Sequence, residues 1–317
     1  MATTKLLITG SIAYDLLLNY DGSFTDGIDP SSLDSMSLAF VTPHFERHYG
    51  GTGSNIAYNL QLLGGDPILV SSVGDDGDEY LSLLSNKGID VSYIDRVTGK
   101  MTATAILATD TSERHIIFFH PGADAAGKWP DLSSQKEDIS YAIVSPRDAS
   151  LMMKAIDWCC ENEIPVIFDP GQQLLSFGDD ELKRGIDNCN ALIVNSYEWN
   201  SIADRLNTSE QDIIDQLDFL VITMGEDGLR IITKEEEIKI PACKAGSVIN
   251  PTGAGDALRS GLLFGLDSGW SFKDIGRLGA AMGSFAVEQR GTLLKNLDID
   301  ALKSRAKSAY GEELPKW

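Results

Sequence analysis

The feature that most constrains the fold is a regular alternation of short apolar runs with segments of helical periodicity. Six apolar runs have the length and composition of buried strands: residues 5–9, 68–72, 141–145, 165–169, 191–194 and 219–223. Apolar residues recur at helical spacing in seven other segments: 55–63, 79–87, 151–162, 180–186, 196–206, 273–288 and 298–308. Strand–helix alternation produces a parallel sheet with helices on both faces. We therefore expect a three-layer α/β fold with a doubly wound sheet.

Two regions, 12–50 and 92–122, interrupt this alternation. The second holds two β-like runs, 102–109 and 115–119, joined by a turn, which is typical of a hairpin. We predict that the two regions form a small β-sheet that stands off the main domain as a lid. An extension of the main sheet's edge is the alternative. The core would then comprise residues 1–11, 51–91 and 123–317.

The composition restricts the classes of partner. The formal net charge of −21 argues against nucleic acid and against an anionic membrane surface. No apolar run approaches the length of a membrane span. The four cysteines form no C-x-x-C pair, and the four histidines are scattered without the spacing of a zinc site. We expect a cytoplasmic protein with reduced thiols that acts on a small molecule.

A glycine-rich turn leads into a further helical segment. After the apolar residues 248–249, which we interpret as a strand end, Gly253, Ala254 and Gly255 precede a helix that begins at Asp256. Such a turn points unpaired amides and the positive end of the helix dipole at one spot, which suits a phosphate. Asp256 would then accept a proton from an alcohol that attacks the phosphoryl group. A plainly capped helix is the alternative, and the Walker and dinucleotide-binding patterns do not fit.

Polar residues also follow the predicted strands, at the edge where open parallel sheets bind ligands. They are Ser11 and Asp15 after the first strand, Gln172 after the fourth, Asn195 and Glu198 after the fifth, Thr223 and Gly225 after the sixth, and Asn250 before the glycine-rich turn. Any one of them taken alone is more often a helix cap than a ligand. Their convergence on one edge favours a binding site.

A second glycine cluster stands before the helical segment 55–63. Gly50 and Gly51 permit close approach of a ligand to the backbone, and the Asn55 amide suits sugar hydroxyls. A loop with an Asn or Ser cap is the equally weighted alternative.

These motifs together resemble those of the ribokinase (PfkB-type) kinases. The N-terminal signature of that family is similar to Gly50-Gly51-x-x-x-Asn55-x-Ala57-x-x-Leu60-x-x-Leu63-Gly64, and its C-terminal signature to Pro251-Thr252-Gly253-Ala254-Gly255-Asp256. Asn195-x-x-Glu198 and Thr223-Met224-Gly225-x-x-Gly228 resemble two further family motifs. The order and spacing agree over nearly the whole chain. The resemblance implies a ribokinase-like fold and an ATP-dependent kinase for the primary alcohol of a sugar-like molecule.

The resemblance also implies roles for individual residues. Asp256 would be the general base, and the backbone of Gly253, Ala254 and Gly255 would form the anion hole and contact ATP. Substrate would be bound by Ser11, Asp15, Gly50, Gly51 and Asn55. ATP would be bordered by Asn195, Thr223, Gly225 and Gly228. Glu198 would organise Mg²⁺ through water.

Further motifs are similar to those of bacterial adenosine kinases. These are Gly10-Ser11-Ile12-Ala13-x-Asp15, Phe119-x-Pro121-Gly122-Ala123, Asp169-Pro170-Gly171-Gln172-Gln173 and Asn195-x-Tyr197-Glu198-Trp199. The resemblance implies adenosine as the substrate, with Phe119 stacked on the base and Gln172 at its edge. A ribokinase- or fructokinase-type sugar kinase is the alternative, because the lid strand carries Thr104, Ala105 and Ile106 where nucleoside kinases tend to place a second aromatic.

Asn250 departs from the family pattern, which usually has Asp at this position. Asn keeps an oxygen but loses the charge near a monovalent-cation site, so activation by K⁺ stays open. The same departure motivates another alternative, a catalytically silent binding protein, and a hydrolase that uses Asp256 is a weaker one. An exposed lid sheet could also pair two copies into a homodimer.

Overall fold

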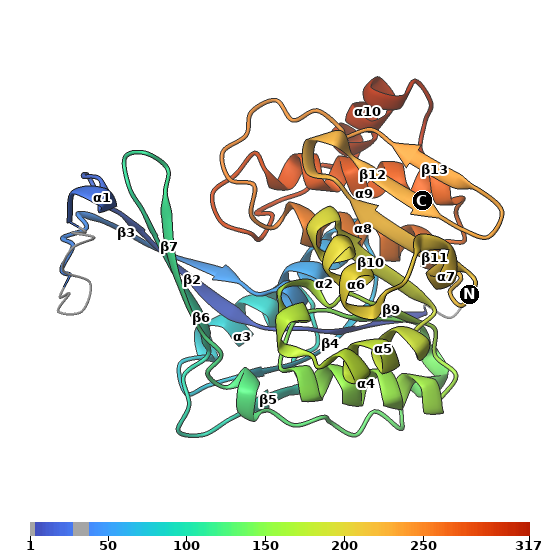
Figure 1. The fold of residues 1–317 in the computed structure, drawn as a ribbon, viewed down its shortest axis with the longest axis horizontal. Helices are drawn as coiled ribbons and strands as arrows, with labels where there is room; N and C mark the ends of the chain where they lie inside the picture. The colour runs from blue at the N-terminus through green and yellow to red at the C-terminus, as the bar shows by residue number, and fades with distance from the viewer. Residues whose placement is uncertain (1–3, 28–37) are drawn as a thin grey trace.

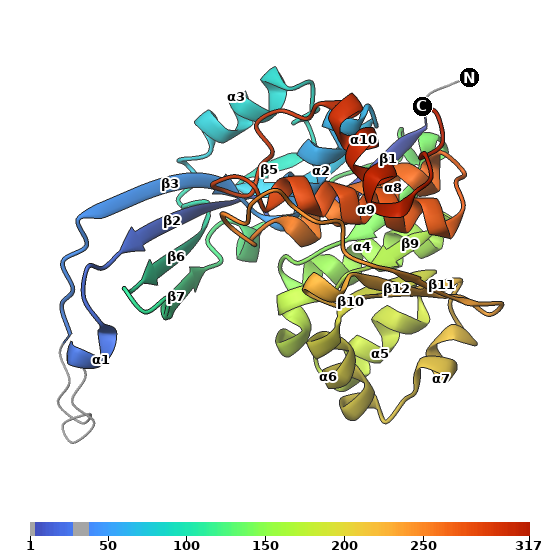
Figure 2. The ribbon, with the colours of Figure 1, turned by 90° about the horizontal axis from the view of Figure 1, so that it is seen from above.

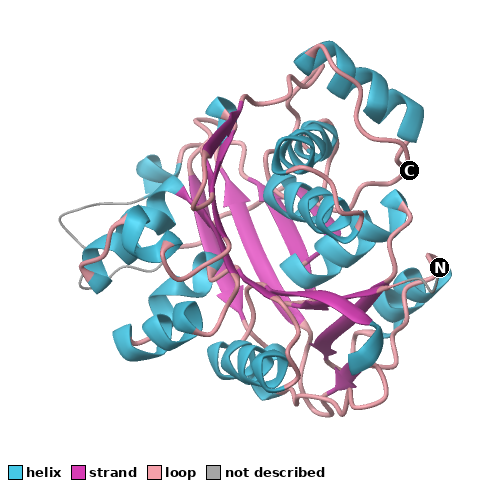
Figure 3. Ribbon diagram, turned by 90° about the vertical axis from the view of Figure 1, so that its right-hand side faces the viewer, coloured by secondary structure: helices cyan, strands magenta, loops and turns pink. Residues whose placement is uncertain are grey.

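The large β-sheet forms the centre of the molecule, and helices cover both of its faces (Figures 1 and 3). A computed structural model describes residues 4–27 and 38–317. The sheet has the strand order β13-β12-β11-β10-β9-β8-β1-β4-β5. The bounds are β1 Lys5–Thr9, β4 Pro67–Val73, β5 Ile94–Arg96, β8 Ile139–Val144, β9 Val166–Phe168, β10 Ala191–Asn195, β11 Phe219–Thr223, β12 Leu229–Ile232 and β13 Glu237–Ile240.

The six predicted strands are all confirmed as parallel neighbours in this sheet, from β4 through β1, β8, β9 and β10 to β11. The sequence interpretation missed the three strands at the edges. At one edge, β12 and β13 form an antiparallel hairpin that continues from β11. At the other edge, β5 pairs with β4. Residues 94–96 therefore belong to the large sheet, although the sequence assigned them to the lid.

The central strands are apolar throughout because both of their faces are buried. Along β1, the side chains of Leu6 and Ile8 enter one hydrophobic core and the side chain of Leu7 enters the other, and all three are fully buried. This alternation divides the interior into two cores, one on each face of the sheet. The expected three layers of a doubly wound α/β fold are thus confirmed.

Ten α-helices are described: five line one core, four line the other, and α1 lines neither. Their bounds are α1 Phe24–Gly27, α2 Thr52–Leu63, α3 Asp78–Asn86, α4 Ala149–Glu161, α5 Asp179–Asp187, α6 Ser196–Leu206, α7 Glu210–Ile214, α8 Ala254–Asp267, α9 Phe272–Ala286 and α10 Ile299–Tyr310. Residues of α2, α3, α8, α9 and α10 line the core that contains Leu6, and residues of α4 to α7 line the other core. None of the described helices combines the length and the apolar character needed to cross a membrane.

A separate sheet of four strands projects from the body of the molecule (Figure 2). Its order is β3-β2-β6-β7, with bounds β2 Ala13–Asn19, β3 His44–Gly50, β6 Ala103–Thr109 and β7 His115–His120. The predicted hairpin is confirmed, because β6 and β7 pair antiparallel. The Asp110 carboxylate accepts hydrogen bonds from the amides of Ser112 and Arg114 and so closes the turn. This sheet is therefore not an edge extension of the large one, and we refer to it as the lid sheet.

Tyrosine side chains join the lid sheet to the core. Tyr14 of β2 and Tyr49 of β3 pack against Tyr80 of α3, with ring centroids 5.7 and 4.7 Å from that of Tyr80. The Tyr14 hydroxyl donates a hydrogen bond to the backbone carbonyl of Asp76. Because β2 begins only four residues after β1 ends, the lid sheet grows directly from the carboxyl edge of the large sheet.

Candidate active site

A cavity of about 900 Å³ lies between the lid sheet and the carboxyl ends of the large-sheet strands. All but one of the residues predicted to bind substrate line it: Ser11, Asp15, Gly51, Asn55, Phe119, Gln172 and Asp256. Gly50, the exception, lies behind Asp15. The structure thus brings together segments that are up to 245 residues apart in sequence, from Ser11 to Asp256.

The glycine-rich turn lies at one end of this cavity. Gly253 adopts a left-handed conformation (φ +87°) as the N-cap of α8, and a Cβ there would lie 3.0 Å from Thr292. The helix begins at Ala254, two residues earlier than predicted, so Asp256 is the third helical residue. Amides in the first turn of a helix have no intrahelical acceptor and carry the positive end of the dipole. The turn therefore presents the unpaired amides on which the prediction of an anion site rests.

The segment before the turn corrects one prediction. Residues 248–249 are not the end of a strand; Val248 and Ile249 are exposed and irregular. The amides of Ile249 and Asn250 donate to the carbonyl of Val287 instead. Asn250 uses its side-chain oxygen to accept a hydrogen bond from the Thr252 amide at 2.9 Å, which shapes the turn without a charge.

Asp256 is held in place by a chain of hydrogen bonds. Asn55 donates from its side-chain nitrogen to the Asp256 carboxylate at 2.7 Å, and Thr292 donates to the Asn55 oxygen at 3.1 Å. Burial raises the pKa of Asp256 to about 7, and Arg259 and the Asn55 hydrogen bond oppose the rise. Asn55 lies within α2 and makes this contact across the site, so the alternative of a plain helix cap is wrong for Asn55. A carboxyl with a pKa near 7 is suited to take up a proton at neutral pH.

The two glycines at 50 and 51 are needed by the protein's own side chains and backbone. A Cβ on Gly50 would lie 2.2 Å from an oxygen of Asp15, and a Cβ on Gly51 would lie 2.5 Å from the Ser11 carbonyl. Gly51 also has a positive φ of 98°. These glycines let β3 pass close under Asp15, whose pKa is raised to about 6 by burial, with His48 opposing the rise.

Among the described residues, Phe119 is the one Phe, Tyr or Trp side chain that lines the cavity from its lid face, beside the imidazoles of His44, His48 and His115. Phe119 of β7 lies opposite Ala105 of β6, and both line the cavity. Gln172, which follows β9, lines it from the core side. The small Ala105 side chain leaves one face of the cavity without a second ring, as the sequence indicated.

The residues predicted to border a nucleotide lie at the ends of two neighbouring strands. Asn195 ends β10 and Thr223 ends β11, and the two residues are paired in register. Gly228 has a φ of 94°, and a Cβ there would lie 2.0 Å from the Ile240 carbonyl, so only glycine fits the turn into β12. Gly225 also has a positive φ, of 59°, and faces open space. This open turn leaves room for a ligand along the edge.

Glu198 forms a capping box with Asn195 at the start of α6. The Glu198 carboxylate accepts from the Asn195 amide, and the Asn195 side-chain oxygen accepts from the Glu198 amide, both at 2.8 Å. One carboxylate oxygen of Glu198 stays free of these bonds, and burial raises the pKa of this residue. The described residues contain no cluster of three or more metal-ligating side chains. Mg²⁺ is commonly held by one or two carboxylates with phosphates and waters, so a single carboxylate at this edge fits that ion.

A buried ion pair lies beside the glycine-rich turn, and the sequence interpretation did not assign it a role. Arg259 of α8 donates to both carboxylate oxygens of Asp169, which follows β9, at 2.5 and 2.6 Å. The Asp169 side chain is almost fully buried. Arg259 lies three residues after Asp256, a spacing that places both side chains on one face of the helix. That spacing was the available signal; Thr292, which lies in a distant loop, gave none.

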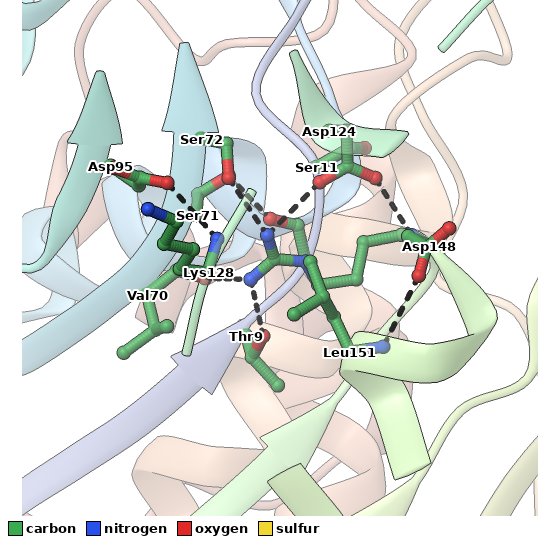
Figure 4. Close-up of polar contacts among 12 residues, drawn as sticks. Thr9, Ser11, Val70, Ser71, Ser72, Asp95, Asp124, Lys128, Asp148 and Leu151 are labelled. Atoms are coloured by element: carbon green, nitrogen blue, oxygen red, sulfur yellow. Dashed lines mark hydrogen bonds and ion pairs between the residues drawn. The ribbon is translucent and has the colours of Figure 1, made fainter. Parts of the chain in front are cut away.

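A second buried ion pair lies where β7 returns to the core. Figure 4 shows Thr9, Val70, Ser72 and Asp124 around one guanidinium group, which is that of Arg147. The Asp124 carboxylate also accepts a hydrogen bond from the Asp148 amide, at 2.7 Å. Asp148 in turn caps α4. This network ties the end of the lid sheet to the carboxyl ends of β1 and β4.

Comparisons with known proteins agree on one family. The model of the pfkB family carbohydrate kinases matches residues 3–299. A nucleoside kinase of Methanocaldococcus jannaschii is 33% identical over 289 residues, which are 90% of this chain and 91% of that protein. The structure of a Burkholderia thailandensis nucleoside kinase in complex with inosine has a TM-score of 0.86 and 32% identity, covering 98% of this chain and 100% of that one. Its complex with ADP and inosine has a TM-score of 0.84 and 33% identity, covering 99% and 98%.

Proposed function

This chain belongs to the pfkB family of carbohydrate kinases, and we propose that it transfers the γ-phosphoryl group of ATP to the 5′-hydroxyl of a nucleoside, adenosine first among them. The observation that carries the proposal is the position of Asp256, on the first turn of α8 and in the wall of the cavity. Asp15, Asn55 and Phe119 line the same cavity, so a base, groups for sugar hydroxyls and a ring for stacking face one space.

In the proposed reaction, the 5′-oxygen of the nucleoside forms a bond to the γ-phosphorus of ATP. The bond from that phosphorus to the β,γ-bridging oxygen breaks, and ADP leaves with the electron pair. The proton of the hydroxyl passes to the Asp256 carboxylate, whose pKa of about 7 permits this at neutral pH. Asn55 orients the carboxylate through its 2.7 Å hydrogen bond.

Gly253, Ala254 and Gly255 would supply the amides that bind the transferred phosphoryl group, as an anion hole at the start of a helix. Thr223, Gly225 and Gly228, with Asn195, would border ATP along the ends of β10 and β11. Mg²⁺ near Glu198 would offset the negative charge of the phosphates. The family membership supports these roles, and the identity of 32–33% to the nucleoside kinases named above supports the substrate class.

Nucleoside recognition would use Asp15 and Asn55 for the ribose, with Gly51 and Ser11 beside them, and Phe119 and Gln172 for the base. An amide presents both a donor and an acceptor, so Gln172 can pair with the edge of either adenosine or inosine. The single ring at Phe119 offers stacking on one face of the base only. We therefore expect a preference for purines rather than strict selection of adenosine.

The substrate test is a panel of ADP-formation assays with adenosine, inosine, cytidine, ribose and fructose, each with ATP and Mg²⁺. We expect turnover with the purine nucleosides at much higher kcat/KM than with the free sugars. Turnover of ribose or fructose with inert nucleosides would replace the nucleoside proposal with that of a sugar kinase. Binding of nucleosides without turnover, at any concentration of Mg²⁺ or K⁺, would indicate a silent binding protein.

The proposal also includes a homodimer formed through the lid sheet, in a cytoplasmic enzyme that obtains ATP there and keeps its thiols reduced. Phe45 and Phe118 on this sheet are each at least 60% exposed and do not line the cavity, which leaves apolar area for a second copy. Sedimentation equilibrium tests it: a dimer that becomes monomeric in Phe45→Ser/Phe118→Ser supports the interface, and a monomeric wild type refutes it.

A further inference from the structure

We propose that Arg259 is a further catalytic residue: one nitrogen of its guanidinium group, Nη1, donates a hydrogen bond to the phosphoryl group during transfer, and Asp169 positions it for that contact. This inference rests on the proposed phosphoryl transfer. It assigns to α8 two functional side chains, the base Asp256 and the donor Arg259, one helical turn apart.

The geometry of the ion pair leaves one nitrogen free. Nε and Nη2 of Arg259 both donate to the Asp169 carboxylate, at 2.5 and 2.6 Å. Within residues 4–27 and 38–317, Nη1 has no hydrogen-bond partner. It is also not one of the fully buried polar atoms that lack a partner there, so it lies in solvent-accessible space. A two-point contact of this kind fixes the plane of the guanidinium group and hence the direction of its remaining donors.

The free nitrogen lies against the glycine-rich turn. A Cβ on Gly255 would lie 2.8 Å from Nη1 of Arg259, nearer than real Cβ contacts come. Gly255 is not one of the described glycines that have a positive φ. Glycine at this position therefore provides space for the guanidinium group and is not required by the backbone conformation. Nη1 therefore sits beside the amides that would bind the phosphoryl group.

The charges around Arg259 fit the same role. Arg259 is the strongest influence that opposes the raised pKa of Asp256, and it also opposes the raised pKa of Glu198. Its guanidinium group thus lies within electrostatic reach of both the proposed base and the proposed Mg²⁺ residue. Asp169 without Arg259 would be a buried anion facing a polyphosphate, which would weaken binding of ATP.

The competing interpretation is that the ion pair is purely structural. A catalytic Arg259 and a structural Arg259 predict different effects on transition-state binding. Removal of one preorganised donor to developing charge lowers kcat by about 10²–10³-fold. An arginine that contacts the phosphoryl group in the same chain belongs to this class of effect. A structural arginine would change stability and leave the ratio of transition-state to ground-state binding unaltered.

The experiment compares Arg259→Lys, Arg259→Gln and the charge-neutral pair Asp169→Asn/Arg259→Gln with wild type. Arg184→Gln is the matched control, because Arg184 makes an exposed ion pair with Asp157 far from the turn. For each protein we would measure kcat, the KM values for ATP and nucleoside, the melting temperature, and the affinity for ADP in the presence and absence of aluminium fluoride, which with ADP mimics the transferring phosphoryl group.

We expect kcat to fall about 10²–10³-fold in Arg259→Gln, with the KM for nucleoside within a few-fold of wild type. We also expect aluminium fluoride to tighten ADP binding in wild type and Arg184→Gln but not in Arg259→Gln or the double variant. Arg259→Lys should recover part of the effect. A folded double variant with wild-type kcat, or with undiminished tightening by aluminium fluoride, would overturn the assignment.

The design separates this inference from the proposed function. A wild type that phosphorylates none of the nucleosides refutes the proposed substrate, while the aluminium fluoride measurement still decides whether Arg259 contacts the phosphoryl mimic. If Arg259→Gln fails to fold because Asp169 loses its partner, kcat and the effect of aluminium fluoride on ADP binding can still be compared with wild type in the double variant and in Arg259→Lys.

Discussion

Two buried arginines, Arg147 at the base of the lid sheet and Arg259 beside the glycine-rich turn, are each paired with an aspartate but differ in which nitrogen lacks a partner. In Arg147 it is the fully buried Nε, and in Arg259 it is the accessible Nη1. Both terminal nitrogens of Arg147 are occupied, by Thr9, Val70, Ser72 and Asp124 (Figure 4). In Arg259, Nε and Nη2 donate to Asp169, and the third nitrogen, Nη1, faces the turn. A guanidinium group whose two terminal nitrogens are both bonded within the protein fixes structure, whereas one with an accessible, unbonded terminal nitrogen can bind a ligand.

The difference follows from what surrounds each pair. Arg147 is 1% exposed and lies between three strand ends and the segment that returns from the lid sheet. Arg259 projects from α8 toward the edge where strands end and polar side chains gather. The first pair should therefore influence stability, and the second should influence rate.

The largest expected effect belongs to Asp256, the proposed base beside Arg259. Asp256→Asn should lower kcat by about 10²–10⁴-fold, because an amide cannot accept the proton. ADP formation at saturating substrate measures this. A variant that retains a tenth or more of the wild-type kcat would remove Asp256 from the role of base.

The same variant has a stability signature that serves as its control. The folded pKa of Asp256 is about 7 against an ordinary 3.8, so the folded state holds the proton in this range. Wild type should lose stability relative to Asp256→Asn as pH rises from about 4 to 7, and the difference should be constant above that range. Urea unfolding of both proteins at several pH values measures how this difference in stability changes with pH. A wild type that gains stability relative to Asp256→Asn as pH rises would contradict the raised pKa.

Arg147 supplies the contrasting prediction. Arg147→Gln leaves the Asp124 carboxylate buried without its cation, which should cost about 3–5 kcal/mol of unfolding free energy. Urea unfolding measures the loss, and kcat per folded molecule should stay within a few-fold of wild type. Asp124→Asn, which retains an acceptor for the Asp148 amide, should cost less. A large loss of kcat with little loss of stability would reverse the proposed contrast between the two arginines.

A smaller effect concerns the pH dependence. Because Asp256 must be ionised to act, kcat/KM should rise with pH through a midpoint near 7. Arg259 opposes the raised pKa, so Arg259→Gln should move the midpoint upward and Arg259→Lys should move it less. A profile measured between pH 5 and 9 checks both statements. An unchanged midpoint in Arg259→Gln would show that the guanidinium charge does not reach the base.

The smallest expected effect is that of K⁺. Asn250 shapes the turn through a neutral hydrogen bond to the Thr252 amide, so no carboxylate is present there to attract a cation. Replacing Na⁺ by K⁺ should leave kcat nearly unchanged, and Asn250→Asp should create a response to K⁺. Strong activation of the wild type by K⁺ would contradict this prediction.

The large sheet could be predicted from sequence because its central strands are buried on both faces and read as continuous apolar runs. β12 and β13 were not predicted because each has only four residues, is only partly buried and carries charged residues such as Arg230 and Lys239. The segment 248–249 was misread for the converse reason: two apolar side chains suggested a strand, but both are exposed. Apolar character alone does not distinguish a buried strand from an exposed loop.

Site residues that stand in a local sequence motif were predictable. Contacts between residues that are distant in sequence were not. Asp256 and Asn55 stand in recognisable glycine-rich segments, so the sequence indicated both. The bond between them joins residues 201 positions apart, and the supporting Thr292 lies in a loop with no pattern of its own. The Arg259 and Asp169 pair needed the structure for the same reason, since only the contact of α8 with the segment after β9 shows that one nitrogen stays free.

The most direct measurement is a ³¹P NMR time course of wild-type protein with ATP, Mg²⁺ and adenosine. Transfer by Asp256 and the glycine-rich turn predicts that ADP and adenosine 5′-monophosphate appear at equal rates, with no resonance from inorganic phosphate above the background of a protein-free sample. Release of inorganic phosphate in place of the monophosphate, or a phosphate attached to another hydroxyl of the ribose, would contradict it.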